Sequence, residues 1–470
     1  MQRLNPMDAQ FVDAEDQDRH ASFAISSTAV FEGPAPSYGE FLDAISARLP
    51  LVPMYRRKLR TVPFRLGPPV WVDDPGFDLR YHVRHTALPA PGGSDQLSRL
   101  IARVMSQRLD RAYPLWEYWL VDGLSEGRWA LISKVHHAMV DGVSGTDLYR
   151  VIFDLSPEPS PLPPAGDRHA PDEPSELSLL GGAALDLAAR YVAGARVLTD
   201  TLLRPAAAAE QAAEVTRALA KLTDSAQPAA PSSLCGPIGQ QRRFTWVQAS
   251  LKDVKKIKRE LGGTVNDVVL AAISSGYRAL LLARGEQPGA HMLPSLIPVS
   301  LRAAGEENIY ENRVSVLVAD LPVHIADPVE RLTAVRAELQ ALKTSNEAML
   351  GEALTSLGRY TPFPFASWLV RLGFGLPQRD IVTVTTNVPG PQQPLYGMGR
   401  RIVEIIPYVP IATTLRTGVS IFTYCDNVMF GITGDFAANP DLDILARGIE
   451  EDLAELKKAS RRIRQAAPKA

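Results

Sequence analysis

The 470-residue sequence has only two cysteines, Cys235 and Cys425, and this scarcity limits the chemistry that it can carry. Two cysteines exclude a disulfide framework and any zinc or iron–sulfur site built on cysteine ligands. A metal site would need converging histidine and carboxylate ligands instead, and we expect none. So few thiols also suit a reducing compartment.

Net charge is almost absent as well, because 50 Lys and Arg residues against 52 Asp and Glu residues give −2. Without a general positive field, nucleic acid is not an expected partner, and any anion site must be local. The chain also lacks a run of eighteen apolar residues and, at its start, the apolar core of a secretory signal. We therefore expect a cytoplasmic protein with no membrane-spanning helix.

What the sequence does have is enough apolar material, 46%, for a large core, and enough length for two domains or two large lobes. Strand-like and helix-like segments alternate up to about residue 155 and again after residue 242, which predicts an α/β fold. A proline-rich stretch and an Ala-rich helical pattern separate them. We divide the chain into a first lobe, 1–155, a connector, 156–240, and a second lobe, 241–470.

The sequence HHAMVDG at residues 136–142 follows an apolar, strand-like segment at 129–135. Successive strand residues point to opposite faces, so only one of His136 and His137 can enter a given site. On this register His137 shares the face of Val135. The glycine and the helical pattern that follow predict a tight corner that presents an imidazole; a pair of structural histidines is the alternative.

The pattern HHxxxDG resembles the motif of the chloramphenicol acetyltransferase and condensation-domain superfamily. Six further stretches, in order, make the chain resemble the bacterial wax ester synthase/acyl-CoA:diacylglycerol acyltransferase family over essentially its whole length. They are LNPMDA at 4–9, PLWE at 114–117, GPIG at 236–239, NDVVLA at 266–271, PVSLR at 298–302 and NVPGP at 387–391. The resemblance implies two chloramphenicol-acetyltransferase-like α/β sandwich lobes, with the active site in a channel between them.

The resemblance also implies the reaction: transfer of a long-chain acyl group from acyl-CoA to the hydroxyl of diacylglycerol or of a long-chain alcohol. Acyl-CoA is then a substrate, and no cofactor is expected. Two alternatives stay open: a related condensation-type enzyme that uses a carrier-protein thioester, and a non-catalytic lipid-surface protein with the same fold. Peripheral contact with the inner membrane face or with lipid droplets is compatible with these lipid substrates.

An alcohol needs a base to take its proton as it attacks a thioester, and histidine, with a pKa of about 6.5, suits that role. By resemblance, the second histidine, His137, is the base and His136 is structural. The segment GVSGT at 142–146 departs at Thr146 from the nucleophile motif Gly-x-Ser-x-Gly, and neither cysteine has an adjacent histidine. We therefore expect direct attack without an acyl-enzyme.

The corner itself needs support. By resemblance, Asp141 is structural and forms an ion pair with an arginine, for which Arg56 and Arg302 compete; we favour Arg56. Gly142 is interpreted as backbone geometry, because a Cβ atom would crowd the corner.

Two further groups of residues are candidates for substrate contacts. Asn266, Asn387 and Thr386 offer amide and hydroxyl donors for the oxyanion of the tetrahedral intermediate, although Asn266 could equally be a helix N-cap and Asn387 part of an ordinary strand end. For the phosphates of coenzyme A the candidates are basic; they are Arg242, Arg243, Lys255 and Lys256. A solvated helix face is the alternative for the two lysines.

Overall fold

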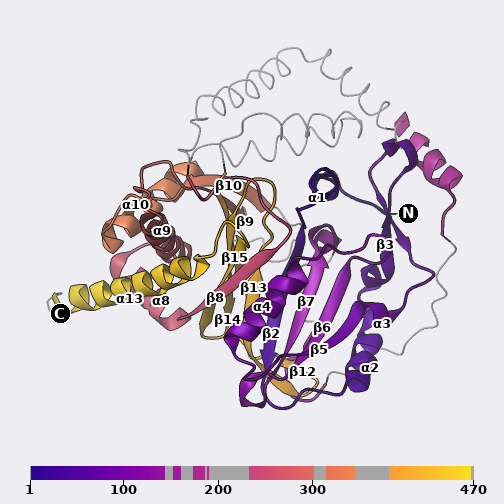
Figure 1. Cartoon of the computed structure of the whole chain (residues 1–470), viewed down its shortest axis with the longest axis horizontal. Coiled ribbons are helices and arrows are strands. Elements are labelled where there is room, and N and C mark those ends of the chain that lie inside the picture. Colours follow the sequence, from indigo (N-terminus) through magenta and orange to yellow (C-terminus); the bar gives the residue numbers. More distant parts are fainter. Residues whose placement is uncertain are drawn as a thin grey trace, which may run out of the picture.

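The computed structural model describes residues 2–142, 152–159, 173–185, 188–189, 232–300, 314–344 and 381–466. They form two lobes, each built on a six-stranded sheet with helices, and a small three-stranded sheet beside the first lobe (Figure 1). This mixed α/β, two-lobe architecture confirms the predicted fold class.

The first lobe has the strand order β12-β13-β2-β7-β6-β5, with all neighbours antiparallel except β5 and β6. Its strands are β2 (Ala24–Phe31), β5 (Val83–Ala87), β6 (Trp116–Asp122), β7 (Trp129–His136), β12 (Tyr396–Gly397) and β13 (Arg400–Tyr408). The small sheet consists of β1 (Gln2–Arg3), β3 (Arg57–Arg60) and β4 (Val70–Asp73).

Four α-helices and five 3-10 turns lie among residues 2–142 of the first lobe. The helices are α1 (Pro6–Gln17), α2 (Tyr38–Arg48), α3 (Leu79–His82) and α4 (Ser94–Met105). The turns are η1 (Leu49–Leu51), η2 (Pro53–Arg56), η3 (Pro63–Arg65), η4 (Ser125–Gly127) and η5 (His137–Gly142). Helix α1 begins where the Asn5 side chain accepts a hydrogen bond from the Asp8 N–H, 2.7 Å away, which is the N-cap arrangement. It packs against η5 and so against the predicted corner.

The second lobe has the strand order β10-β9-β11-β14-β15-β8. Its strands are β8 (Arg242–Ser250), β9 (Pro294–Ser300), β10 (Val314–Asp320), β11 (Thr383–Pro389), β14 (Thr417–Tyr424) and β15 (Asn427–Asp435). Its helices are α8 (Leu251–Leu261), α9 (Val265–Ala283), α10 (Pro328–Thr344) and α13 (Leu442–Ala466). Among the described helices, α9 alone is long and apolar enough to cross a membrane, but 67% of its apolar window is buried, as in a core helix.

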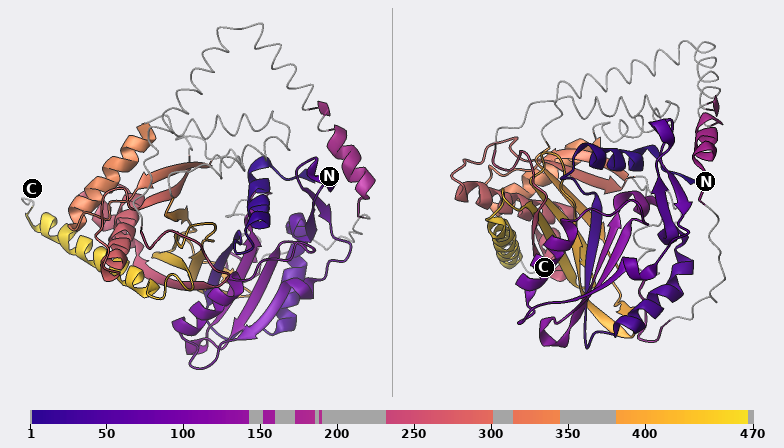
Figure 2. Two further views of the ribbon diagram at one scale, coloured as in Figure 1. Left: turned by 45° about the horizontal axis from the view of Figure 1, so that its top comes forward. Right: turned by 45° about the vertical axis from the view of Figure 1, so that its right-hand side comes forward.

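One segment crosses between the lobes. Strands β12 and β13 come late in the chain, yet β13 pairs antiparallel with β2 and extends the first lobe's sheet (Figure 2). The division at residue 241 did not anticipate this exchange, because a strand's apolar pattern does not reveal which sheet it joins. The exchange ties the two lobes together through the backbone.

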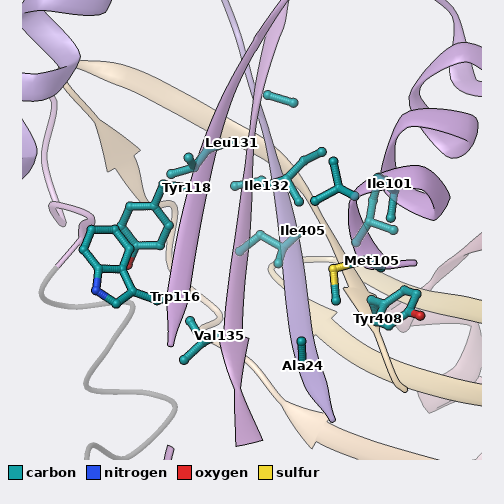
Figure 3. Packing of buried hydrophobic residues seen from close by; sticks show 14 of the residues in the cluster. Ala24, Ile101, Met105, Trp116, Tyr118, Leu131, Ile132, Val135, Ile405 and Tyr408 are labelled. Atoms are coloured by element: carbon teal, nitrogen blue, oxygen red, sulfur yellow. The ribbon is translucent and has the colours of Figure 1, made fainter. Parts of the chain in front are cut away.

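Strand β7 is buried along its whole length, because both of its faces are covered. Leu131 and Val135 lie on the side of the aromatic residues of β6, whereas Ile132 lies on the side of Ile101 and Met105 of α4 (Figure 3). A strand packed in this way holds its last residue, His136, in a fixed place.

Candidate active site

The two histidines lie where β7 turns into η5. His136 ends the strand, and its N–H donates to the Leu115 carbonyl over 3.0 Å. The strand does not continue to His137, which begins η5, so the expectation that His137 shares the strand face of Val135 was wrong. The two side chains differ in exposure: His136 is 2% exposed, whereas His137 is half-buried.

Both ring nitrogens of His136 lie close to polar groups. Its Nδ1 accepts a hydrogen bond from the Ala138 N–H, 3.1 Å away, and its Nε2 lies 3.3 Å from a carboxylate oxygen of Glu15. Because Nδ1 is an acceptor, the proton of the neutral ring is on Nε2 and faces the carboxylate. His136 is thus a buried, oriented group.

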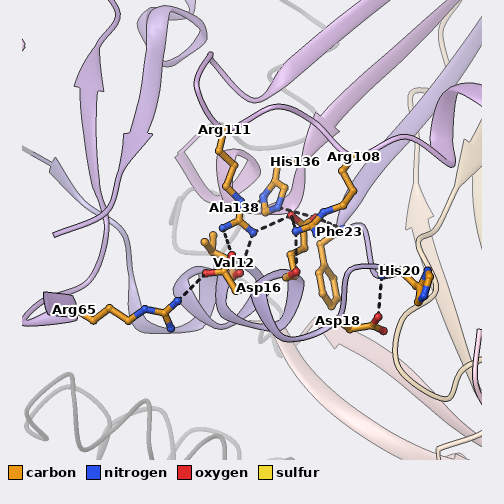
Figure 4. A network of polar contacts seen from close by, with 11 residues as sticks. Val12, Asp16, Asp18, His20, Phe23, Arg65, Arg108, Arg111, His136 and Ala138 are labelled. Carbon is orange, nitrogen blue, oxygen red and sulfur yellow. Dashed lines mark hydrogen bonds and ion pairs between the residues drawn. The ribbon is translucent and has the colours of Figure 1, made fainter. Parts of the chain in front are cut away.

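A polar network that includes Arg108, Arg111 and His136 joins α1 to the loop after α4 (Figure 4). Glu15 is 2% exposed, and its carboxylate contacts all three of these side chains. Its carboxylate accepts from the Phe23 N–H over 2.7 Å and contacts Arg108 at 3.3 Å and Arg111 at 3.1 Å. Burial acts to raise the pKa of Glu15. The contacts with His136, the Phe23 N–H and Arg111 outweigh burial and lower this pKa from 4.5 to about 2. The carboxylate is therefore charged at neutral pH.

The ring of His137 rests on α1. Its centroid lies 4.3 Å from that of Phe11, and the rings are tilted by 42°. The His137 N–H donates to the Phe23 carbonyl over 2.9 Å. A half-buried imidazole supported on one face is suited to exchange a proton with a small molecule that approaches it.

The predicted support of the corner is only partly visible. Asp141 and Gly142 end η5, but the Asp141 side chain lies outside the described residues, and so does all of Arg302. The guanidinium of Arg56 lies over the ring of Phe77, with its Cζ 5.3 Å from the centroid, and no carboxylate among the described side chains is within ion-pair distance of it. The choice between the two arginines stays a prediction.

Two predicted oxyanion donors do come together. Helix α9 is capped by Thr264 with Asp267 in a capping box, so Asn266 is not the N-cap. Instead, the Asn266 Oδ1 accepts from the Nδ2 of Asn387 on β11, 2.9 Å away. Thr386 is the strand neighbour of Asn387 and therefore points to the opposite face of β11.

The structure argues against a phosphate role for Arg242. Only 5% of this residue is exposed, and its guanidinium donates to the carbonyls of Gly239 at 2.5 Å, Gln241 at 3.1 Å and His20 at 2.6 Å. Its own N–H donates to the Ser106 hydroxyl over 2.9 Å. Arg242 thus joins the start of β8 to the first lobe and has no free face for an anion.

The other basic candidates do not form one site. The Arg243 Nε donates to the Phe436 carbonyl over 3.0 Å, and its Cζ lies 4.2 Å from that ring's centroid. Lys255 and Lys256 belong to α8, beyond the far end of β8, and Lys255 is exposed. Arg243 is the second residue of β8, so about seven residue steps, roughly 23 Å at about 3.3 Å each, separate it from the strand end at which α8 begins.

Glu15, Arg108 and Arg111 were not predicted from the sequence. The only signal is spacing: Glu15 follows Phe11 by four residues and Val12 by three, so these side chains share one face of α1. An acid on the face that meets the core needs a charged partner. The described residues hold no group of three or more His, Cys, Asp or Glu side chains that could bind a metal ion.

The two-lobe fold is that of the chloramphenicol acetyltransferase-like proteins. The first condensation domain of the calcium-dependent antibiotic synthetase matches it with a TM-score of 0.59 and 15% identity, over 97% of this chain and 96% of that chain. This likeness concerns the fold alone.

Closer matches identify the family. The family model of the wax ester synthase/diacylglycerol acyltransferase catalytic domain matches residues 4–269, and that of the WS/DGAT C-terminal domain matches residues 310–457. The probable diacyglycerol O-acyltransferase tgs1 of Mycobacterium tuberculosis (strain ATCC 25618 / H37Rv) is 41% identical over 463 residues, 98% of this chain and 97% of that protein. The solved wax ester synthase/diacylglycerol acyltransferase from Marinobacter aquaeolei VT8 has a TM-score of 0.67 and 26% identity, over 97% of this chain and 99% of that chain. The chain therefore belongs to the wax ester synthase/diacylglycerol acyltransferase family, as the resemblance predicted, and is an acyltransferase.

Proposed function

We propose that the protein transfers a long-chain acyl group from acyl-CoA to the hydroxyl of diacylglycerol, which gives triacylglycerol, and to a long-chain alcohol, which gives a wax ester. The observation that carries the proposal is the half-buried imidazole of His137, presented at the end of a fully buried strand with His136 fixed behind it. The names of the relatives supply the substrate class.

In the proposed reaction His137 takes the proton of the acceptor hydroxyl while the oxygen attacks the thioester carbonyl. The tetrahedral intermediate then releases the thiolate of coenzyme A, whose pKa is near the thiol value of about 8.5, and the thiolate receives the proton from His137. An ester and free coenzyme A result, with no cofactor or metal ion. Burial raises the pKa of the Cys425 thiol, which disfavours the thiolate that an acyl-enzyme on this residue would need.

The oxyanion of the intermediate needs donors that are already in place. We assign this role to the amide pair of Asn266 and Asn387, because the bond between them uses one N–H and leaves further N–H groups to donate. Asp141, paired with Arg56, would keep the corner closed. The reaction would take place in a channel between the lobes.

Peripheral contact with a lipid surface, at the inner membrane face or on lipid droplets in the cytoplasm, is part of this proposal. Phe64 is 86% exposed in the turn between β3 and β4, and Leu66 is 41% exposed. Phe64 and Arg65 both have positive φ angles, 57° and 52°, a backbone conformation that is uncommon for residues other than glycine. Such an exposed apolar turn suits partial insertion among acyl chains.

A short helix packs on the same small sheet and also exposes apolar side chains. Residues 176–185 form a short apolar helix whose Leu179 and Ala183 pack on Val62, Val70 and Val72 of the small sheet and its flanks. Leu177 and Leu185 on that helix are 80% and 74% exposed. Replacing Phe64 and Leu66 by serine should reduce co-flotation of the protein with anionic vesicles; unchanged flotation would contradict the contact.

One assay tests the reaction. Labelled palmitoyl-CoA is supplied with diacylglycerol or with hexadecanol, and the labelled esters are separated. We expect triacylglycerol and wax ester, with initial-rate lines that intersect because both substrates are bound together. Transfer only from a carrier-protein thioester, or no transfer at all, would favour the alternative functions, and parallel lines would indicate an acyl-enzyme.

A further inference from the structure

The carboxylate of Glu15 contacts the chain on the N-terminal side of His137. One of its oxygens accepts from the Phe23 N–H over 2.7 Å, and the carbonyl of the same residue accepts from the His137 N–H over 2.9 Å. Glu15 thereby fixes the segment to which the His137 backbone is bonded.

The same carboxylate also acts on the C-terminal side of His137. It lies 3.3 Å from the Nε2 of His136, and the Nδ1 of that ring accepts from the Ala138 N–H over 3.1 Å. A carboxylate favours a proton on the nitrogen that faces it, and this leaves Nδ1 free to accept. The Ala138 peptide, directly after His137, is thus held through the His136 ring.

Helix α1 delivers both kinds of support from one face. Phe11 contacts the His137 ring, and Glu15, one turn later, contacts His136. Arg108 and Arg111 fix that turn, because they contact the Glu15 carboxylate and also donate to the backbone carbonyls of Glu15 at 2.8 Å and Val12 at 3.0 Å.

We propose that Glu15 is a positioning residue for acyl transfer: it holds the peptide groups on both sides of His137, one through Phe23 and the other by selecting the Nε2-protonated form of His136. It does not touch the substrate. This proposal rests on the proposed function, in which His137 is the base.

The test compares Glu15→Gln with Asp16→Asn, a matched control on the next residue of α1. Both changes keep the side chain's size and remove one negative charge that faces Arg111, since Asp16 lies 2.6 Å from that arginine. No contact described for Asp16 involves Phe23 or His136. In Glu15→Gln an NH2 group, which cannot accept a hydrogen bond, replaces one carboxylate oxygen. This NH2 group would then face one of the N–H groups that now donate to the carboxylate.

We expect Glu15→Gln to lower kcat by about 100-fold, because small displacements of a reacting group have effects of this order. The KM for palmitoyl-CoA should stay within about twofold, because Glu15 does not bind it. Asp16→Asn should keep kcat within about twofold of the parent protein. Equal losses in the two variants, or a fully active Glu15→Gln variant, would overturn the proposal.

A second measurement does not require Glu15→Gln to be stable. In protein with 15N-labelled histidine rings, the His136 signals, assigned by their loss in His136→Asn, report which nitrogen carries the proton. We expect the proton on Nε2 in the unmodified protein and in Asp16→Asn; a proton on Nδ1 would overturn the proposal. Turnover retained by His137→Ala would instead contradict the proposed function, while the ring signals would still test the hold of Glu15 on His136.

Discussion

In the first lobe the groups around the histidines are charged, whereas in the second lobe the groups around β11 are neutral. Glu15 is surrounded by two arginines and His136, and Lys134, two residues before His136, is fully buried. The Lys134 Nζ donates to the carbonyls of Val104 at 2.9 Å and Gln107 at 2.6 Å, at the C-terminal end of α4.

In the second lobe, the polar contacts around β11 are made by hydroxyl and amide groups. The Tyr277 hydroxyl lies 2.6 Å from that of Thr383 and donates to that of Thr417 over 2.9 Å. Burial raises the pKa of Tyr277 to about 12, so this phenol stays neutral. Asn266 and Asn387 form their hydrogen-bonded pair near the end of β11, the strand that begins at Thr383.

The difference suits the proposed reaction. A histidine that exchanges protons needs a fixed orientation and a defined electrostatic surrounding, which a buried network of charges supplies. An oxyanion exists only briefly, and neutral donors that are already oriented stabilise it without adding a charge that must be buried in the resting protein. The two lobes therefore differ in how their function should respond to mutation and to pH.

The largest expected effect falls on the first lobe's base. His137→Ala should reduce kcat by about 1,000-fold, within the range for loss of a general base, because no other group takes the hydroxyl proton. His136→Ala should fold and retain a reduced activity, because it disturbs the corner but leaves the base in place. Turnover with palmitoyl-CoA and diacylglycerol, together with circular dichroism, measures both. An inactive, folded His136→Ala beside an active His137→Ala would reverse the assignment.

The second lobe provides the next effect. Asn387→Ala and Asn266→Ala should each lower kcat by about 100-fold if the amide pair stabilises the oxyanion, with little change in the KM for acyl-CoA. Because each amide orients the other, the double variant should lose little more than either single one.

Thermal melting of the two single variants and the double variant provides the control for this comparison. A lower melting temperature with unchanged kcat in both single variants would make the pair a purely structural link between α9 and β11. In that case Thr386, on the other face of the strand, becomes the remaining donor to test.

Local features of the sequence were predictable, whereas the contacts between distant segments were not. The strand predicted at 129–135, which the structure extends by one residue to His136, follows from the apolar pattern. Glu15 and His136 are 121 residues apart, and neither residue's surroundings in the sequence reveal the other.

Arg242 is a case in which the sequence suggested a site that the contacts between distant segments do not support. Adjacent arginines in the sequence suggest an anion site, but the fold places backbone carbonyls around the first of them and a phenyl ring against the second. The exchange of β13 is similar, because its partner β2 lies far away in the chain. Composition alone cannot distinguish a free cation from one that satisfies buried carbonyls.

A smaller effect concerns the pH dependence of stability, which should arise from Lys134, a buried ionisable group of the first lobe. Burial lowers the pKa of Lys134 from 10.5 to about 8, so the unfolded chain binds this proton more tightly than the folded protein does. The free energy of unfolding should therefore rise with pH between about 8 and 10.5, by up to about 1.4 kcal/mol per pH unit from this group.

Urea unfolding of the parent protein and of Lys134→Met at pH 7 and pH 9.5 measures that contribution. The difference in unfolding free energy, parent minus variant, should increase by about 2 kcal/mol over this interval. Lys252→Met, at a residue whose side chain is 76% exposed, should show no such increase. A difference for Lys134→Met that is independent of pH would show that the lysine is not destabilised by burial.

The smallest effect is expected at the surface of α8. Its buried side chains, Leu251, Val254 and Ile257, face the core, and this leaves Lys255 and Lys256 away from it. On this side of an amphipathic helix they have the setting of a solvated face, where single charges contribute little. The double change Lys255→Ala, Lys256→Ala should therefore keep the KM for palmitoyl-CoA within about twofold at low ionic strength. A several-fold rise in KM that disappears with dephospho-coenzyme A as the carrier would instead assign these lysines to the 3′-phosphate and restore the original prediction for them.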